Sequence, residues 1–314
     1  MTADALLVVL SAFTLRTMQQ PATLSAAWNK LPMARPAIST APVKRKEGSL
    51  GIDIAATSAI VMDADSGAVL FEKNADAVVP IASLSKLLTA MTFLDQKPDF
   101  SKAVEIQPSD DPVLGRTTLP TKERFTTQEV FDAMLIGSVN ESANSLARIT
   151  LGTEDFMKKM NEKAQALGLK RMHFADPSGE DSRNVGTARE VALALKYASA
   201  YPEATQAMKR ASVTLHGVKK PYQINTTNLL LASDLNKGSF KVLAAKTGTL
   251  PEAGYCYALM TQGKDGQKVI VVLLGGETHF GRFQDVKALT YWAFDTFEWP
   301  GRAQVSITPN AARN

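Results

Sequence analysis

Strand-like sequences stand at both ends of the main part of this chain, and helical sequences lie between them. The segment "SAIVMDADSGAVLFEK", residues 58–73, has the pattern of two strands around a turn at Asp65-Ser66-Gly67. The last third of the chain contains four more strand-like runs, "ASVTLHG", "FKVLAAKTGT", "GYCYALMT" and "KVIVVLLGG". A sheet that draws on both groups is assembled from distant parts of the chain, and the helical middle then forms a second lobe. We therefore expect an α+β fold, with a ligand site where the two lobes meet.

Capping signals place helices in the middle of the sequence. Thr126 and Glu129 have the spacing of a capping box, and Thr187 and Glu190 repeat it. Thr153 is the expected N-cap of another helix. We expect helices over about 83–94, 126–137, 141–151, 153–168, 187–200 and 282–297.

The first 50 residues have the character of a leader and a linker. An apolar run over residues 5–15 has the length of a signal-peptide core and is too short to span a bilayer, although Asp4 stands where a basic residue is usual. Residues 16–50 are rich in proline and lack periodic hydrophobicity, which indicates a linker or disordered arm. We expect a signal or anchor and linker at 1–50, a folded domain at 51–300 with a helical subdomain at about 96–200, and a tail at 301–314.

The composition argues against several classes of function. The net charge is +4 and the pI is near 9.0, but lysines and arginines do not cluster with aromatic residues, so we expect no nucleic-acid partner. A single cysteine, Cys256, excludes an internal disulfide. His173, His216 and His279 lack the spacing of metal ligands, so we expect no metal site.

Ser83 and Lys86 stand at the start of an otherwise apolar helix, in "PIASLSKLLTAM". Residues three apart lie on one side of a helix, one turn from each other. A serine hydroxyl becomes a nucleophile when a base lies within hydrogen-bonding reach. A buried lysine can be that base, because burial lowers its pKa and leaves it neutral for part of the time. The pair therefore predicts an activated serine.

Lys246-Thr247-Gly248 is a second motif, on a segment that reads as a strand. An ammonium and a hydroxyl fixed on an edge strand can hold a substrate carboxylate. The glycine allows the backbone to pass close to a ligand.

Ser-x-Asn is the third motif, and it occurs three times. We choose Ser138 and Asn140, because they fall in the break between two predicted helices, where side chains can point into a cleft. Ser142 and Asn144 are expected to lie in the following helix as surface residues.

The three motifs, in this order, resemble the set found in penicillin-binding proteins and class A β-lactamases. The resemblance extends to "AIVMDADSGAVLFEKNADAVVPIASLSKLLTAM", "DAMLIGSVNESANSLA", "FADPSGEDSRNVGTARE", "INTTNLLLAS" and "AAKTGTLPEAGYCYAL". Together these segments, over roughly residues 55–297, look like the D-alanyl-D-alanine carboxypeptidase and endopeptidase family of low-molecular-mass penicillin-binding proteins. The resemblance implies a transpeptidase fold: an antiparallel sheet of about five strands flanked by helices, with a helical subdomain.

The resemblance also implies catalytic roles. Ser83 would attack the carbonyl of a D-alanine residue and form an acyl-enzyme, and Lys86 would take its proton. Ser138 would relay a proton to the leaving amine. The backbone N–H groups of Ser83 and Thr249 would form the oxyanion hole, and water would then release the product.

Substrate-binding roles follow from the same resemblance. Asn140 would bind the amide on the acyl side of the substrate. Lys246 and Thr247, with Thr249, would hold its carboxylate end, and Gly248 completes that motif. No metal or organic cofactor is implied.

Glu180 is a departure from the family pattern, in which a leucine often follows the "DPSG" turn. Glu180 and Asn184 also match the end residues of the class A β-lactamase "E-x-x-L-N" element, in which the glutamate is a deacylation base. A β-lactamase is therefore one alternative. A non-catalytic β-lactam sensor or cell-wall binding protein is another.

The chain ends soon after its last predicted helix, whereas carboxypeptidases of this family often continue into a β-rich domain and a membrane anchor. We therefore expect the endopeptidase type first and the carboxypeptidase type next. The expected partners are peptidoglycan stem peptides and cross-links, with β-lactams as covalent inhibitors. The expected location is the periplasm or cell envelope, with membrane contact only through an uncleaved N-terminus.

Overall fold

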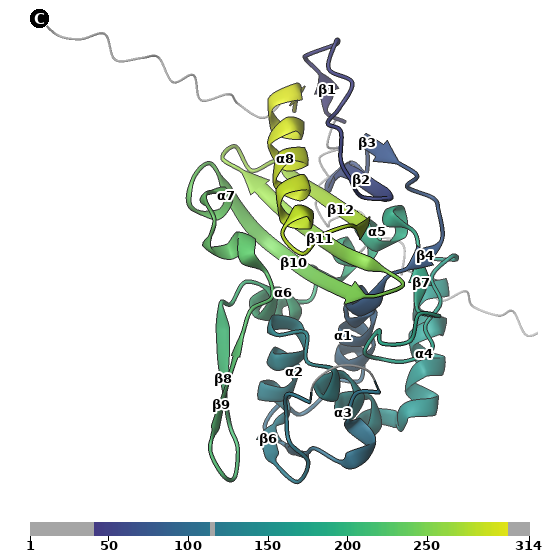
Figure 1. The fold of residues 1–314 in the computed structure, drawn as a ribbon, viewed down its shortest axis with the longest axis vertical. Helices are drawn as coiled ribbons and strands as arrows, with labels where there is room; N and C mark the ends of the chain where they lie inside the picture. The colour runs from purple at the N-terminus through teal and green to yellow at the C-terminus, as the bar shows by residue number, and fades with distance from the viewer. Residues whose placement is uncertain (1–40, 114–116, 301–314) are drawn as a thin grey trace, which may run out of the picture. The chain divides into compact units, whose positions relative to one another are not determined.

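A five-stranded antiparallel sheet forms the centre of the computed structural model, which describes residues 41–113 and 117–300 (Figure 1). The strand order is β10-β11-β12-β2-β3. The strands are β2 (Ser58–Asp63), β3 (Val69–Lys73), β10 (Phe240–Leu250), β11 (Gly254–Gly263) and β12 (Lys268–Gly276). Strand β12 pairs with β2, with Leu273 opposite Ala59, so the two ends of the domain meet in the middle of the sheet. The predicted α+β class and the antiparallel sheet of about five strands are confirmed.

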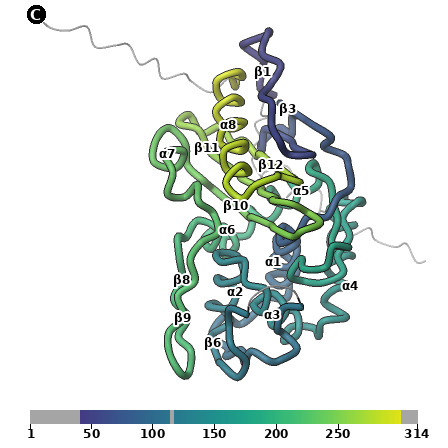
Figure 2. The backbone as a smooth tube through the Cα atoms, in the orientation of Figure 1, coloured from purple at the N-terminus to yellow at the C-terminus, as the bar shows by residue number. Residues whose placement is uncertain are grey.

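The two faces of the sheet belong to two different hydrophobic cores. Because side chains alternate along a strand, Ile60 and Met62 enter one core while Ala59 and Val61 enter the other. Helix α8 (Gly281–Thr296) covers one face through residues such as Val286. The opposite face packs against the helical part of the domain, most of which lies below the sheet in the tube view (Figure 2).

Helix α1 lies at the centre of the helical part. The helices are α1 (Lys86–Asp95), α2 (Thr127–Ile136), α3 (Asn140–Leu151), α4 (Thr153–Ala166), α5 (Ala188–Ala198) and α6 (Pro202–Met208). Helix α1 contacts α2, α3, α4 and α5, so every residue from Lys86 to Phe93 is buried. The burial of polar side chains in α1 requires that other parts of the chain supply their hydrogen bonds.

Short elements complete the domain. They are β1 (Val43–Lys44) paired with β13 (Phe297–Glu298), β4 (Val79–Pro80) with β7 (Val185–Gly186), β5 (Ala103–Glu105) with β6 (Arg124–Thr126), β8 (Ser212–His216) with β9 (Pro221–Asn225), the 3₁₀ turns η2 (Ala82–Ser85), η3 (Pro108–Asp110) and η4 (Leu229–Ala232), and the short helix α7 (Asp234–Lys237). Strand β8 was expected from the sequence, but it forms a hairpin with β9 outside the main sheet.

The helix caps agree with the sequence in part. The capping box of Thr126 and Glu129 is confirmed at the start of α2. The prediction for Thr153 is wrong: it is the first residue of α4, and Gly152, with φ of 79°, is the N-cap. At α5 the Thr187 side chain accepts from the Glu190 N–H, but the Glu190 carboxylate turns away and accepts from the Arg171 N–H.

The chain around the domain was expected to be a leader, a linker and a tail. Residues 1–40 and 301–314 lie outside the described residues. Residues 41–50, which we assigned to the linker, contain strand β1. Among the described helices, none is long and apolar enough to cross a membrane.

Trp299 fixes the end of the described chain to the main sheet. Its indole N–H donates to Oδ1 of Asp63 at 2.7 Å, and both side chains are buried. The other carboxylate oxygen of Asp63 accepts from the Ser66 N–H and hydroxyl. The contact therefore satisfies a buried charge at the end of β2.

We predict that Trp299→Phe lowers the free energy of unfolding by about 1–3 kcal/mol, because a buried carboxylate oxygen loses its donor. Urea denaturation measures this. Trp292→Phe is the matched control, because the Trp292 indole donates to a half-buried hydroxyl, that of Ser49, which water can reach. An equal loss for both variants would contradict the prediction.

Candidate active site

Ser83 lies in the turn η2, immediately before α1. It is the one residue between Ile81 and Phe93 that is not buried. The preceding residue, Ala82, has a φ of 48°, which is unusual for a residue with a side chain and marks a constrained backbone. The chain thus exposes a single hydroxyl at the start of a helix that is otherwise enclosed.

Lys86 is fully buried one turn after Ser83. Its Nζ donates to Ser83 Oγ at 2.9 Å, to Asn140 Oδ1 at 2.7 Å and to the Ser178 carbonyl at 2.5 Å. The Ser83 hydroxyl in turn donates to the Ser178 carbonyl at 3.3 Å. These contacts bring together η2, the first residue of α3 and the loop before β7.

Burial lowers the pKa of Lys86 to about 7, while the carboxylates of Asp176, Glu180 and Glu141 oppose that shift. A lysine with such a pKa is neutral in a large fraction of molecules at pH 7 to 8. A neutral amine at 2.9 Å from a serine hydroxyl has the geometry and the basicity to accept its proton.

Lys246 and Ser138 form a second buried contact across the same site. Lys246 Nζ donates to Ser138 Oγ at 2.7 Å and to the Thr247 carbonyl at 2.8 Å. Its pKa lies well below the usual range because of burial and because of the cations of Lys86 and Arg282. Ser138 has a φ of 60° in the break between α2 and α3, which turns its side chain out of the helical run.

Gly248 brings β10 against the turn that carries the serine. A Cβ atom at this position would lie 3.2 Å from Ser83 N and 3.0 Å from the Ile81 carbonyl. Only a residue without a side chain allows the two backbones to approach so closely. The backbone of Thr249, the next residue, therefore runs beside the Ser83 N–H.

Arg282, at the start of α8, supports the same end of β10. Its guanidinium is buried and donates to the Gly248 carbonyl at 2.9 Å and to Thr249 Oγ1 at 3.0 Å. Thr247 Oγ1 lies 2.6 Å from Thr227 Oγ1. Thr249 is an exposed residue, and its hydroxyl also donates to the Gly248 carbonyl at 2.8 Å, so Arg282 reaches the surface of the site through this hydroxyl.

All eight residues predicted for the site therefore lie in one region. Ser83, Lys86 and Asn140 are joined by hydrogen bonds, Ser138 and Lys246 form the second contact, and Gly248 joins β10 to the serine turn. Sequence reasoning missed three contributors, Ser178, Thr227 and Arg282. The first two stand in segments that resemble the family, but their contacts use a backbone carbonyl and an unremarkable hydroxyl.

In the β-lactamase alternative, Glu180 would be a deacylation base, at one end of an element that Asn184 ends. Glu180 Oε2 accepts from the Val113 N–H at 3.3 Å and from the Ser178 hydroxyl at 3.5 Å. Asn184 is fully buried, and its amide bonds to Ala175, Asp176 and Ser85. Asn184 is therefore a structural residue of the loop and does not face a substrate. Within residues 41–113 and 117–300, no cluster of acidic, histidine or cysteine side chains could hold a metal.

A family model described as D-alanyl-D-alanine carboxypeptidase matches residues 42–278. The chain belongs to this family. It is 32% identical to a D-alanyl-D-alanine endopeptidase of Pseudomonas aeruginosa, over 88% of this chain and 87% of that protein. It is 30% identical to an endopeptidase of the same name from Escherichia coli, over 76% and 77%.

A solved structure of a family relative gives the same fold. The structure of penicillin-binding protein D2 from Listeria monocytogenes, in its cefotaxime-bound form, matches 78% of this chain and 100% of its own, at 30% identity and a TM-score of 0.68. The family and the fold confirm the sequence prediction of a serine DD-peptidase with a transpeptidase fold.

We predict that Gly248→Ala slows acylation of Ser83 by about 10-fold or more, because the new methyl group pushes β10 away from the serine turn by tenths of an ångström. Labelling with a fluorescent penicillin measures the rate. Gly48→Ala is the control, since no atom lies within 4 Å of a Cβ at that position. Wild-type labelling by Gly248→Ala would contradict the importance of this approach.

We also predict that the acylation rate rises with pH through about 7 and then levels, because only neutral Lys86 accepts the proton of Ser83. Below pH 7 the protonated amine has no free lone pair. Second-order rate constants for a penicillin between pH 5 and 9 test this, with circular dichroism to show that the fold is constant. A flat profile would exclude Lys86 as the base.

Proposed function

We propose that this protein hydrolyses D-alanyl peptide bonds in peptidoglycan through an acyl-enzyme on Ser83. The observation that carries the proposal is the 2.9 Å contact between the buried Lys86 amine and the only accessible hydroxyl of the turn. A buried amine with a pKa of about 7 has the basicity to take the proton of this hydroxyl.

The first half-reaction transfers the acyl group to the enzyme. Ser83 Oγ attacks the carbonyl carbon of the D-alanine residue, and its proton passes to Lys86 Nζ. The carbonyl oxygen becomes an oxyanion between the backbone N–H groups of Ser83 and Thr249, whose approach Gly248 permits. Ser138, held by Lys246 at 2.7 Å, relays this proton from Lys86 to the leaving amine as the peptide bond breaks, which returns Lys86 to its neutral form.

The second half-reaction returns the serine. Water attacks the ester carbon, a proton passes from the water to Lys86, and the Ser83 oxygen regains a proton as it leaves. The same base and the same oxyanion site therefore support both halves. Asn140 lies between the two halves of the site and has its amide nitrogen available for the acyl side of the substrate, while Oδ1 accepts from Lys86.

A carboxylate on the leaving side of the substrate fits the charges beyond Ser138. Lys246 and Arg282 are both buried, and the hydroxyl of Thr249, an exposed residue, accepts from Arg282 at 3.0 Å. Burial lowers the pKa of both groups, and an anion bound beside them would favour their charged forms. Lys246, Thr247 and Thr249 are the residues that we assign to this end of the substrate.

We favour an endopeptidase activity, which cleaves the cross-links between stem peptides. Three relatives that are 30–32% identical to this chain have the name D-alanyl-D-alanine endopeptidase. We further propose that β-lactams acylate Ser83, since one relative of 30% identity, penicillin-binding protein D2, was solved in a cefotaxime-bound and an ampicillin-bound form. We also propose a location in the periplasm or elsewhere in the cell envelope, where such a substrate lies.

The deciding experiment is intact-protein mass spectrometry during exposure to penicillin, with peptide mapping and Ser83→Ala as the control. We expect a persistent adduct on Ser83 and none on the variant. Digestion of purified muropeptides then separates the types: an endopeptidase converts cross-linked dimers to monomers faster than it removes D-alanine from pentapeptides. Rapid loss of the adduct with destruction of the drug would indicate a β-lactamase, and no adduct would indicate a binding protein.

A further inference from the structure

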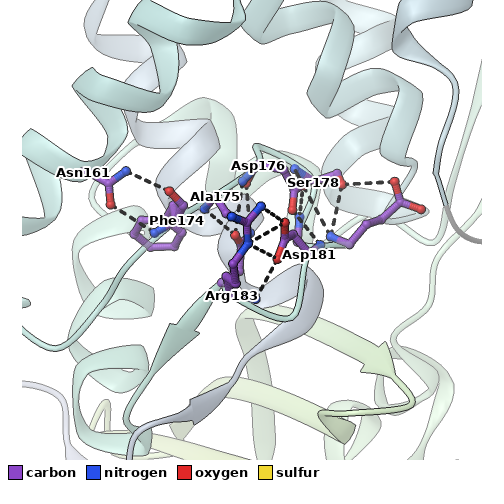
Figure 3. Close-up of polar contacts among 10 residues, drawn as sticks. Asn161, Phe174, Ala175, Asp176, Ser178, Asp181 and Arg183 are labelled. Atoms are coloured by element: carbon purple, nitrogen blue, oxygen red, sulfur yellow. Dashed lines mark hydrogen bonds and ion pairs between the residues drawn. The ribbon is translucent and has the colours of Figure 1, made fainter.

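The carboxylate of Asp176 lies at the centre of the loop that contacts Lys86 (Figure 3). Its Oδ1 accepts from the Ser178 N–H at 2.7 Å, the Ser178 hydroxyl at 2.6 Å and the Gly179 N–H at 2.7 Å. Its Oδ2 accepts from the Asp181 N–H at 2.7 Å. The loop is thus folded around one side chain, which the mechanism above does not use.

One of these bonds fixes the direction of a group in the active site. The Ser178 carbonyl and the Gly179 N–H belong to one planar, trans peptide unit, so they point in opposite directions. Because the N–H points to Asp176, the carbonyl points away from it, toward Lys86 Nζ at 2.5 Å and Ser83 Oγ at 3.3 Å.

The loop is also fixed against the serine turn. A Cβ at Gly179 would lie 2.2 Å from the Ala82 carbonyl, so backbone packs on backbone there. The Thr89 hydroxyl donates to the Pro177 carbonyl at 2.6 Å, and the Asn184 amide donates to Ser85 Oγ at 3.1 Å. Rotation of the 178–179 peptide would therefore change the Lys86 contact without moving the whole loop.

We propose that Asp176 is a positioning residue for the general base: by holding the Gly179 N–H it aims the Ser178 carbonyl at Lys86, and so fixes the amine beside Ser83. Asp176 does not touch Lys86 or the substrate in this role. The inference deepens the proposed function, on which it rests.

The charges around Lys86 allow a positioning role to be separated from a stabilising one. The groups that face the amine are Asp176 and Glu180 on the loop, Glu141 on α3 and Lys246 on β10. Asp176 raises the pKa of Lys86 against the effect of burial. We call the rise of the acylation rate with pH, through the pKa of Lys86, the acidic limb of the profile. Loss of the Asp176 charge moves this limb to lower pH, whereas a purely structural defect lowers the rate without moving the limb.

The test compares Asp176→Asn with Asp181→Asn, which removes one charge from the same loop. Asp181 pairs with Arg183 at the surface, and its N–H, which bonds to Asp176, is unchanged in the variant. We expect penicillin to acylate Asp176→Asn about 10- to 100-fold more slowly than the wild type, because the 178–179 peptide that positions the amine is released. The acidic limb of its profile should lie at lower pH, because the charge of Asp176 is lost. We expect Asp181→Asn to stay within about twofold of the wild type.

A wild-type rate and limb for Asp176→Asn would overturn the inference, as would equal effects of both variants. If Asp176→Asn does not fold, Ser178→Ala decides. It removes the 2.6 Å bond between the Ser178 hydroxyl and Asp176, together with two longer contacts of that hydroxyl with Glu180, at 3.3 Å to its N–H and 3.5 Å to its Oε2. We expect acylation about threefold slower, because Asp176 loses one of the bonds that hold it in the loop.

For Ser178→Ala a wild-type rate overturns the inference. A wild-type protein that penicillin does not acylate would overturn the proposed function, and this inference with it. Normal wild-type acylation beside an unaffected Asp176 variant would overturn this inference alone.

Discussion

The hydrogen bonds of one buried amine, Lys86 Nζ, hold the active site together. An amine without water must find acceptors within the protein, and Lys86 finds them on the serine turn, on α3 and on the loop around Asp176. These three segments are far apart in the chain. Their arrangement therefore depends on a lysine whose burial is unfavourable. The same burial lowers its pKa, which allows the amine to act as a base.

Charge connects this amine to the other side of the site. Lys86 and Lys246 are both fully buried, and burial, followed by the charges of Lys86 and Arg282, lowers the pKa of Lys246. Carboxylates stand near Lys86, but hydroxyls and carbonyls surround Lys246. The site thus has a proton-accepting side at Lys86 and a side at Lys246 that has no carboxylate close by among the described residues. A substrate with a carboxylate supplies the missing negative charge at Lys246.

Much of the site was predictable because its side chains fall in local patterns. Ser83 and Lys86 are one helical turn apart, and Ser138 stands in a break that the capping box and Gly137 mark. The Ser178 carbonyl has no such pattern, because every residue has a carbonyl and only the fold aims it. Arg282 comes from the far end of the chain, and Thr153 failed as a cap because Gly152 adopts the required backbone more easily.

The pairing of β1 with β13 has a mechanical consequence. Val43 lies opposite Glu298 and Lys44 opposite Phe297, so the chain enters and leaves this pair from the same end. Tension between positions 43 and 298 would separate the paired residues one after another. The Trp299 indole, bound to Asp63, would then transmit the force to the end of β2. The serine turn and β10 take no part in the β1–β13 pair or in the Trp299 contact, so a pull on both ends of the domain acts first on contacts that contain no catalytic group.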